Sequence, residues 1–119
     1  TASSNYFYTF RRLDGTTSNT TNNEDAVSYQ SQSGLMCGRI SNVSSKMSNT
    51  EITFFKPTDA SNYKIFQSQF GGWHSTTEIC TGTSTGVYLS STAVTGLTFL
   101  SQSGNIYCEK LYLYGLKNS

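Results

Sequence analysis

The sequence has few charged residues and only one histidine, one proline and one tryptophan. Charged residues make up 13% of its 119 residues, and the formal net charge is +1. Such a balance gives no electrostatic basis for binding nucleic acid or an anionic membrane. No apolar run approaches the ~20 residues that a membrane-spanning helix needs, and no signal-peptide pattern is present. We therefore expect no nucleic-acid partner and no membrane insertion.

Motifs for catalysis and for metal binding are also missing. There is no G-x-S-x-G motif, and His74 is the single imidazole that could serve a hydrolytic triad. The seven acidic residues are scattered, so a pair of carboxylates at glycosidase spacing is not indicated. One histidine and no C-x-x-C pair do not make a zinc site. We predict a protein that is not an enzyme and has neither metal nor cofactor.

The three cysteines are Cys37, Cys80 and Cys108. An odd number leaves at least one free thiol after any internal pairing. In a protein folded in a bacterial cytosol we expect all three to be reduced. In a secreted protein, Cys80 and Cys108 would be the first pair to examine.

Aromatic residues are plentiful, with eight Tyr and seven Phe, whereas good helix formers are scarce. Aromatic and β-branched residues favour strands, and the abundant Ser, Thr, Asn and Gly favour turns and exposed strand faces. The length fits one domain over residues 1–119. Because the chain opens on Thr1, we expect a processed product or a part of a longer chain.

About eight short strands are predicted from alternating patterns and turn signals. Turns are expected at Asp14-Gly15, at Pro57 and at Gly71-Gly72, and the wholly polar residues 16–25 are expected to form an exposed loop. This spacing favours an antiparallel β-sandwich, jelly-roll-like, with an up-and-down barrel as the alternative. The expected strands cover residues 5–12, 26–32, 35–40, 51–56, 62–70, 74–81 and 86–90, followed by a hairpin in 93–117.

The C-terminal hairpin carries the clearest alternation. In its second strand Tyr107, Glu109, Leu111 and Leu113 share one side, and Ile106, Cys108, Lys110, Tyr112 and Tyr114 share the other. The residues between the two strands, Ser103-Gly104-Asn105, are typical of a tight turn.

The same stretch resembles the ending of many phage virion proteins. It reads Val94-Thr95-Gly96-Leu97-Thr98-Phe99, then Ser103-Gly104-Asn105-Ile106, then Leu113-Tyr114-Gly115-Leu116. It is similar to C-terminal β-sandwich domains of tail-fibre and other virion structural proteins, and residues 52–63 also suit such domains. Cys108 and Glu109 stand where those domains often have glycine. The resemblance implies a structural subunit of a phage particle.

A ligand site and an assembly surface are the remaining functional candidates. Sugars bind to aromatic faces and to amide side chains, so Trp73, His74, Gln69 and Tyr63 form the candidate glycan site. Tyrosine is enriched at subunit interfaces. The candidate assembly surface therefore comprises the aromatic residues near the two ends of the chain: Tyr6, Phe7, Tyr8, Tyr112 and Tyr114.

Taken together, these observations predict a virion structural protein of a tail fibre, tail tip or capsid decoration. Its expected partners are other virion proteins, further copies of itself, with a trimer favoured, and host surface glycans. The alternative is a carbohydrate-binding module or adhesin domain of a secreted or cell-surface protein. A third hypothesis, a fragment of a glycan-cleaving enzyme, would use an acid such as Glu78.

Overall fold

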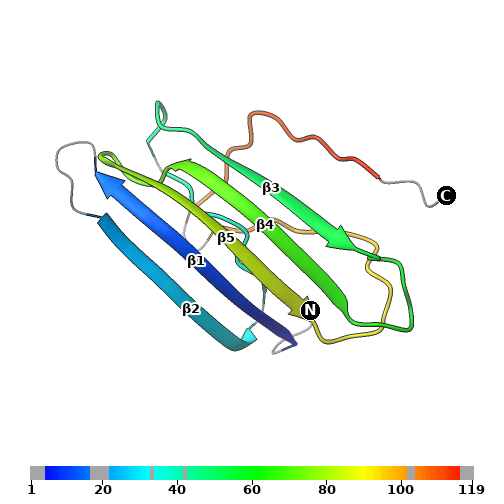
Figure 1. Cartoon of the computed structure of the whole chain (residues 1–119). Helices are drawn as coiled ribbons and strands as arrows, with labels where there is room; N and C mark the ends of the chain where they lie inside the picture. Colours follow the sequence, from blue (N-terminus) through cyan, green and yellow to red (C-terminus); the bar gives the residue numbers. More distant parts are fainter. Residues whose placement is uncertain (1–4, 17–21, 33, 42, 102–103, 116–119) are drawn as a thin grey trace.

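The computed structural model describes residues 5–16, 22–32, 34–41, 43–101 and 104–115. This part of the chain contains five antiparallel strands in one sheet and no helix, which confirms the predicted all-β class. Along the sheet the strands follow the order β2-β1-β5-β4-β3 (Figure 1). The strands are β1 (Tyr6–Thr16), β2 (Asn22–Gln32), β3 (Ser48–Phe55), β4 (Lys64–Trp73) and β5 (Glu78–Tyr88).

The central strand β5 joins two hairpins that are local in sequence. β1 pairs with β2, and β3 pairs with β4, whereas β5 lies between β1 and β4 and pairs with both. At the middle of the sheet Ser84 is opposite Phe10 on one side and Ser68 on the other. β2 and β3 are consequently the two edge strands.

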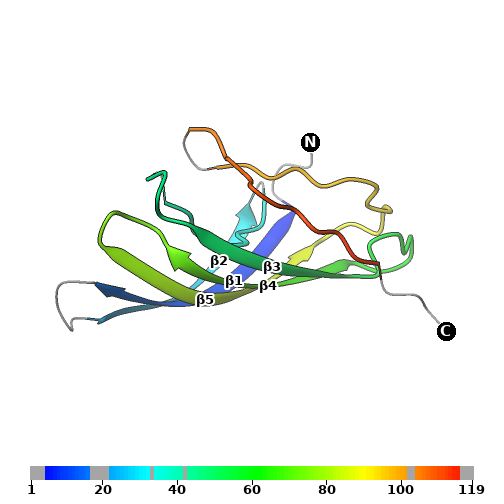
Figure 2. The ribbon, with the colours of Figure 1, turned by 90° about the horizontal axis from the view of Figure 1, so that it is seen from above.

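The two faces of the sheet differ in what lies over them. Residues 34–41, 43–47 and 89–101 run over the same face, and residues 104–115 run beside β3, displaced toward that face (Figures 1 and 2). We call this the covered face and its opposite the open face. On β4 and β5 the burial alternates with the strand period of two, so Phe66, Ser68, Phe70, Cys80 and Ser84 are buried on the covered face.

The core is a band of aromatic rings on the covered face. Phe66 and Phe70 are 3% and 4% exposed. The Phe66 ring lies 5.5 Å from that of Phe54, and the Tyr8 ring lies 5.1 Å from that of Tyr29. Between these pairs β5 presents only small residues. A Cβ atom at Gly82 would lie 2.5 Å from the Phe70 ring, so a glycine is required inside this strand.

Several predicted turns are strand residues in the structure. Asp14 and Gly15 pair with β2 and with β5, so β1 continues to Thr16. Gly71 and Gly72 pair with β3 and so continue β4. A glycine is required at position 72 because the backbone of residues 47 and 48 lies where its Cβ would be. The predicted break between 74–81 and 86–90 is also wrong, since β5 runs through both. In the predicted polar loop 16–25, Asn22 to Asp25 belong to β2, where β1 supplies backbone partners, and residues 17–21 lie outside the described part.

The predicted strand over residues 35–40 and the predicted C-terminal hairpin are not formed in the described residues. Residues 35–40 are an extended covering segment without ladder pairing. Residues 93–101 and 104–115 contain no strand, so the predicted hairpin is not formed there, although Gly104 has the positive φ (73°) of a turn. Residues 102, 103, 116 and 117 of that prediction lie outside the described part. The described strands form one open sheet, neither a closed barrel nor a two-sheet sandwich.

No helix in the described ranges is long and apolar enough to cross a membrane.

Candidate functional site

The open face carries a regular array of polar side chains across the middle of the sheet. Register places Glu51, Gln69, Thr83 and Arg11 side by side on four neighbouring strands. The adjacent row contains Thr53, Gln67, Thr85 and Thr9 in the same way. All eight side chains are exposed. Residues that alternate along each strand therefore produce a continuous polar surface.

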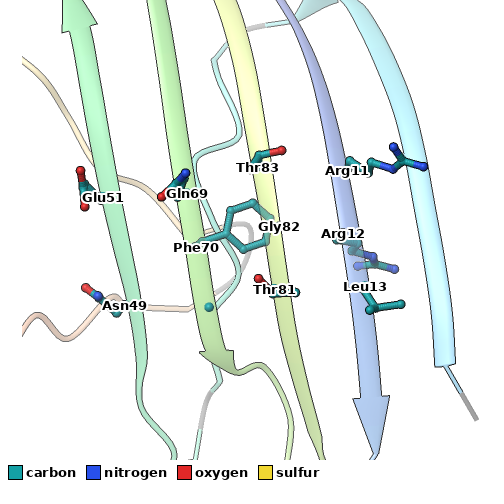
Figure 3. A pocket seen from close by; sticks show the side chains of 11 residues that line it. Arg11, Arg12, Leu13, Asn49, Glu51, Gln69, Phe70, Thr81, Gly82 and Thr83 are labelled. Carbon is teal, nitrogen blue, oxygen red and sulfur yellow. The ribbon is translucent and has the colours of Figure 1, made fainter.

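One row of this array, Arg11, Glu51, Gln69 and Thr83, lines a shallow hollow of about 830 Å³ (Figure 3). Its polar lining residues come from β1, β3, β4 and β5, and Leu13 is an apolar neighbour at 44% exposure. Gly71 and Gly82 also line the hollow and contribute no side chain to it. The polar residues that line it are Arg11, Arg12, Asn49, Glu51, Gln69, Thr81 and Thr83.

The chemistry of the hollow suits a ligand with many hydroxyl groups. Amide and hydroxyl side chains both donate and accept hydrogen bonds, and Arg11, Arg12 and Glu51 add two positive charges and one negative charge. A sugar presents the same mixture of donors and acceptors. The sequence signal for this site is the alternation in Gln67-Ser68-Gln69 and Thr81-Gly82-Thr83-Ser84-Thr85.

An apolar row borders the polar array at one end of the open face. Phe7, Val87, Ile65 and Phe55 are neighbours in register on four strands. Ile65 and Phe55 are 45% and 46% exposed. The open face thus combines a polar centre with an apolar margin.

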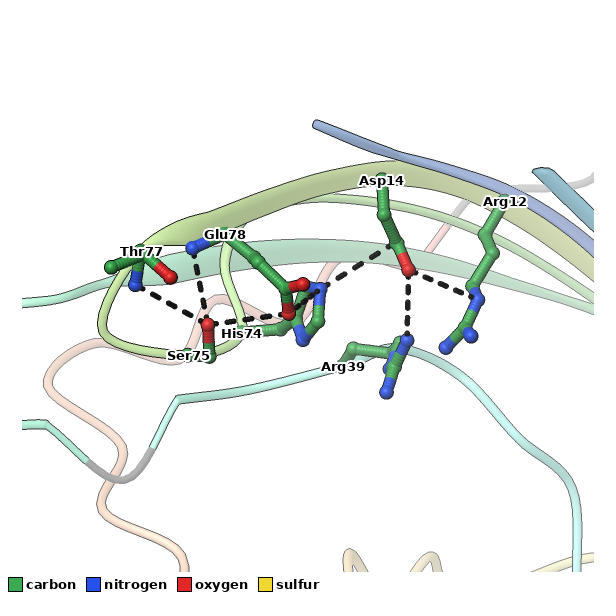
Figure 4. A network of polar contacts seen from close by, with 7 residues as sticks. All are labelled: Arg12, Asp14, Arg39, His74, Ser75, Thr77 and Glu78. Atoms are coloured by element: carbon green, nitrogen blue, oxygen red, sulfur yellow. Dashed lines mark hydrogen bonds and ion pairs between the residues drawn. The ribbon is translucent and has the colours of Figure 1, made fainter. Parts of the chain in front are cut away.

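A buried ionic network lies under the other end of the sheet, on the covered face (Figure 4). The carboxylate of Asp14, 6% exposed as a residue, is 3.5 Å from both Arg12 Nε and Arg39 Nη1. Its second oxygen is 3.6 Å from His74 Nε2, and Glu78 Oε2 is 3.5 Å from the same nitrogen. The network links β1, the covering segment 34–41 and the β4–β5 turn.

Ser75 completes this network at the turn rather than forming a triad with the imidazole. Its hydroxyl donates to Glu78 Oε2 at 3.4 Å and accepts the backbone N–H groups of Thr77 and Glu78. His74 Nε2 faces two carboxylates, those of Asp14 and Glu78. The arrangement serves to hold the turn and the covering segment against the sheet.

The four residues of the predicted glycan site are not brought together. Tyr63 precedes β4 and is 60% exposed, whereas Trp73 and His74 lie at the opposite end of the strand. His74 points into the ionic network, with its side chain 8% exposed. The Trp73 ring is occupied by the Lys46 ammonium group, 3.7 Å from its centroid. Only Gln69 lies in the hollow.

The predicted assembly residues fall into two groups. Tyr6 and Tyr8 are half-buried on the covered face, where Tyr6 stacks on Tyr88 at 4.8 Å. Burial, followed by the neighbouring tyrosine, raises the pKa of each phenol. Phe7 lies in the apolar row of the open face. By contrast, Tyr112 and Tyr114 are 68% and 81% exposed and are free to contact another molecule.

The C-terminal segment exposes far more apolar surface than these two tyrosines. Within it Tyr107, Leu111 and Leu113 are 89%, 73% and 90% exposed. Isolated apolar side chains on a surface are normal, but contiguous ones mark interaction sites. We define the C-terminal segment as residues 104–115.

All three cysteines are free thiols, so the pair Cys80–Cys108 is not formed in this structure. Burial raises the pKa of Cys37, and burial together with the nearby Asp14 carboxylate raises that of Cys80. Cys108 is exposed.

We expect alkylation by iodoacetamide at pH 8 to modify Cys108 first and Cys80 last. A raised pKa leaves less of the reactive thiolate at this pH, and burial blocks access to it. Mass spectrometry of peptides from timed samples measures the order. Modification of Cys80 before Cys108 in the folded protein would contradict the burial of β5.

Within the described residues no group of three or more His, Cys, Asp or Glu side chains could hold a metal ion.

No family model, no curated protein and no solved structure matches the chain. The resemblance of its C-terminal stretch to phage virion domains therefore stays a prediction, and function has to be inferred from the residues of the chain itself.

Proposed function

We propose that the chain is a non-enzymatic structural subunit of a phage particle, in a tail fibre, tail tip or capsid decoration. It assembles with copies of itself, three being the favoured number, and with other virion proteins. The observation that supports this proposal is the C-terminal segment, in which Tyr107, Leu113 and Tyr114 are each more than 80% exposed. Side chains of this kind gain about 1.5 to 3 kcal/mol each when they are buried, so a partner surface stabilises the segment.

The sandwich architecture forms part of the same proposal. Residues 34–41 and 89–101 already lie over the covered face (Figure 2). In the assembled particle they form the second layer of a jelly-roll-like sandwich over the aromatic band. The low charge of the chain suits close packing of many copies, because it limits repulsion between like charges.

The solution mass of the purified protein, measured by light scattering on a sizing column, tests the assembly. A stable trimer or larger closed assembly is the expected result. A monomer at concentrations of tens of micromolar would contradict self-assembly, and purified phage particles that lack the chain by mass spectrometry would contradict the virion role.

The second candidate function is carbohydrate binding, as a host-glycan contact of the virion or as a secreted module. The hollow on the open face favours it, because seven polar residues from four strands line it. This second proposal takes the centre of the sheet, rather than Trp73, as the glycan site, with only Gln69 in common.

We expect Gln69→Ala to weaken binding to any glycan retained on an array by about tenfold, the equivalent of one lost hydrogen bond of roughly 1.4 kcal/mol. Gln67→Ala is the matched control, since Gln67 lies on the same strand and face but does not line the hollow. Equal losses for both variants, or for neither, would place the glycan elsewhere.

A further inference from the structure

The outer edge of β3 has no partner strand in the described part of the chain. β3 is the last strand of the sheet and pairs only with β4. Its other side therefore presents backbone N–H and C=O groups that another strand could pair with. The β3 side chains alternate between the two faces, with Ile52 and Phe54 half-buried and Glu51, Thr53 and Phe55 exposed.

The C-terminal segment has the pattern of a strand but no ladder of its own. In a strand, the side chains of residues 106–114 would point alternately to two sides, yet residues 104–115 are paired with no strand. In both views the segment runs beside β3 in the same direction, displaced toward the covered side (Figures 1 and 2). A free strand edge and an unpaired strand sequence thus occur in one molecule.

We propose that residues 106–114 of one copy add to the sheet of a second copy, as a parallel strand on the outer edge of β3. This inference rests on the proposed self-assembly and names its contact. Pairing supplies the backbone groups of both strands with partners, and it buries the apolar side chains of the segment.

Charge and apolar character select the register. With Lys110 beside Glu51, a parallel strand places Leu111 beside Ile52 and Leu113 beside Phe54. The same shift brings Tyr114 next to Phe55. An antiparallel strand with the same charge pair would instead place Glu109 beside Ile52 and Leu113 beside Ser48. The parallel arrangement therefore matches opposite charges and apolar side chains together.

The occupant of the edge is a second copy because a single chain leaves the segment open. Leu113 stays 90% exposed although β3 of the same chain is close by. Each copy offers one strand and one receiving edge, which makes the contact heterologous, and such a contact forms a ring when the rotation between copies closes and a filament when it does not. A ring of three copies would leave neither a free segment nor a free β3 edge.

A mixed disulfide experiment tests the contact. In the proposed register Cys108 lies beside Asn49 on the neighbouring strand, and adjacent strands about 4.8 Å apart allow a disulfide. One chain carries Asn49→Cys with Cys108→Ser and a size tag, and the other keeps Cys108 and Asn49. Both carry Cys37→Ser. Oxidation of the mixture should give the tagged–untagged dimer.

The matched control replaces Asn49→Cys by Ser28→Cys, an exposed residue on the other edge strand, β2. We expect at least about tenfold more mixed dimer from position 49, because paired strands hold the two thiols at high effective concentration. A variant with Thr53→Cys distinguishes the antiparallel register, in which position 53 lies beside Cys108. Preferential crosslinking of Ser28→Cys or Thr53→Cys would overturn the proposed contact.

Two further outcomes separate this inference from the proposed function. A trimer by light scattering without crosslinking at position 49 would leave assembly standing and reject the strand contact. A single chain with Asn49→Cys and Cys108 that closes on itself as a monomer would show pairing within the chain and reject the second copy. A monomer without any crosslink would reject both proposals.

Discussion

Replacing Leu111 and Leu113 together by serine is expected to convert the assembled protein to monomers. Both side chains are largely exposed in the single chain, at 73% and 90%, and both face apolar neighbours in the proposed contact. Each substitution removes about 2 kcal/mol of apolar burial, so the pair should weaken association by roughly a thousandfold. Light scattering over a concentration series measures the change.

Leu100→Ser is the matched control for this double variant. Leu100 is 82% exposed but lies outside the proposed strand, so the assembly should persist. The thermal unfolding of the monomer should be unchanged in both variants, because neither set of side chains packs on the sheet. Intact assembly of the double variant would show that the C-terminal segment is not the contact.

Phe70→Ala is expected to cause the largest loss of stability of any single substitution discussed. The ring is 4% exposed and lies against Gly82 and Gly38, so its removal leaves a cavity at the centre of the covered face. Buried Phe→Ala changes cost about 3 to 5 kcal/mol. In a chain of this length, that cost lowers the unfolding temperature by roughly 10 to 20 °C.

Phe99→Ala gives the comparison, since Phe99 is 46% exposed and belongs to no strand. Circular dichroism melting curves of the two variants and the parent measure the difference. Similar melting temperatures for Phe70→Ala and the parent would mean that the covered face is not the core of the domain.

Composition was enough to predict the antiparallel all-β class, but strand boundaries depended on contacts that no local pattern contains. Gly71-Gly72 and Asp14-Gly15 have the composition of turns. They are strand residues because neighbouring strands pair with them on both sides. Position 82 within β5 requires a glycine because the Phe70 ring, twelve positions earlier in the chain, takes the space of a side chain. Tertiary packing thus overrode local preference.

Which residues share a candidate site depends on their separation along a strand and on the order of the strands in the sheet. Trp73 and Tyr63 are close in sequence, yet an extended strand of ten residues separates them by roughly 30 Å. The hollow, by contrast, collects Arg11, Glu51, Gln69 and Thr83 from four strands, and only the strand order brings them together. Of the predicted assembly residues, Tyr112 and Tyr114 are exposed, whereas Tyr6 and Tyr8 pack within the domain.

The insertion of β5 between the two hairpins has a consequence for how the chain folds. β1 and β2, like β3 and β4, are close neighbours in sequence and can pair early. β1 and β4 cannot be joined until β5 lies between them. The pairing of Gly15 with Ile79, for example, requires a residue far along the chain. During synthesis both hairpins are therefore complete before the strand that unites them. In that interval their inner edges are open to other chains, so crowding of nascent copies favours mispairing at β1 and β4.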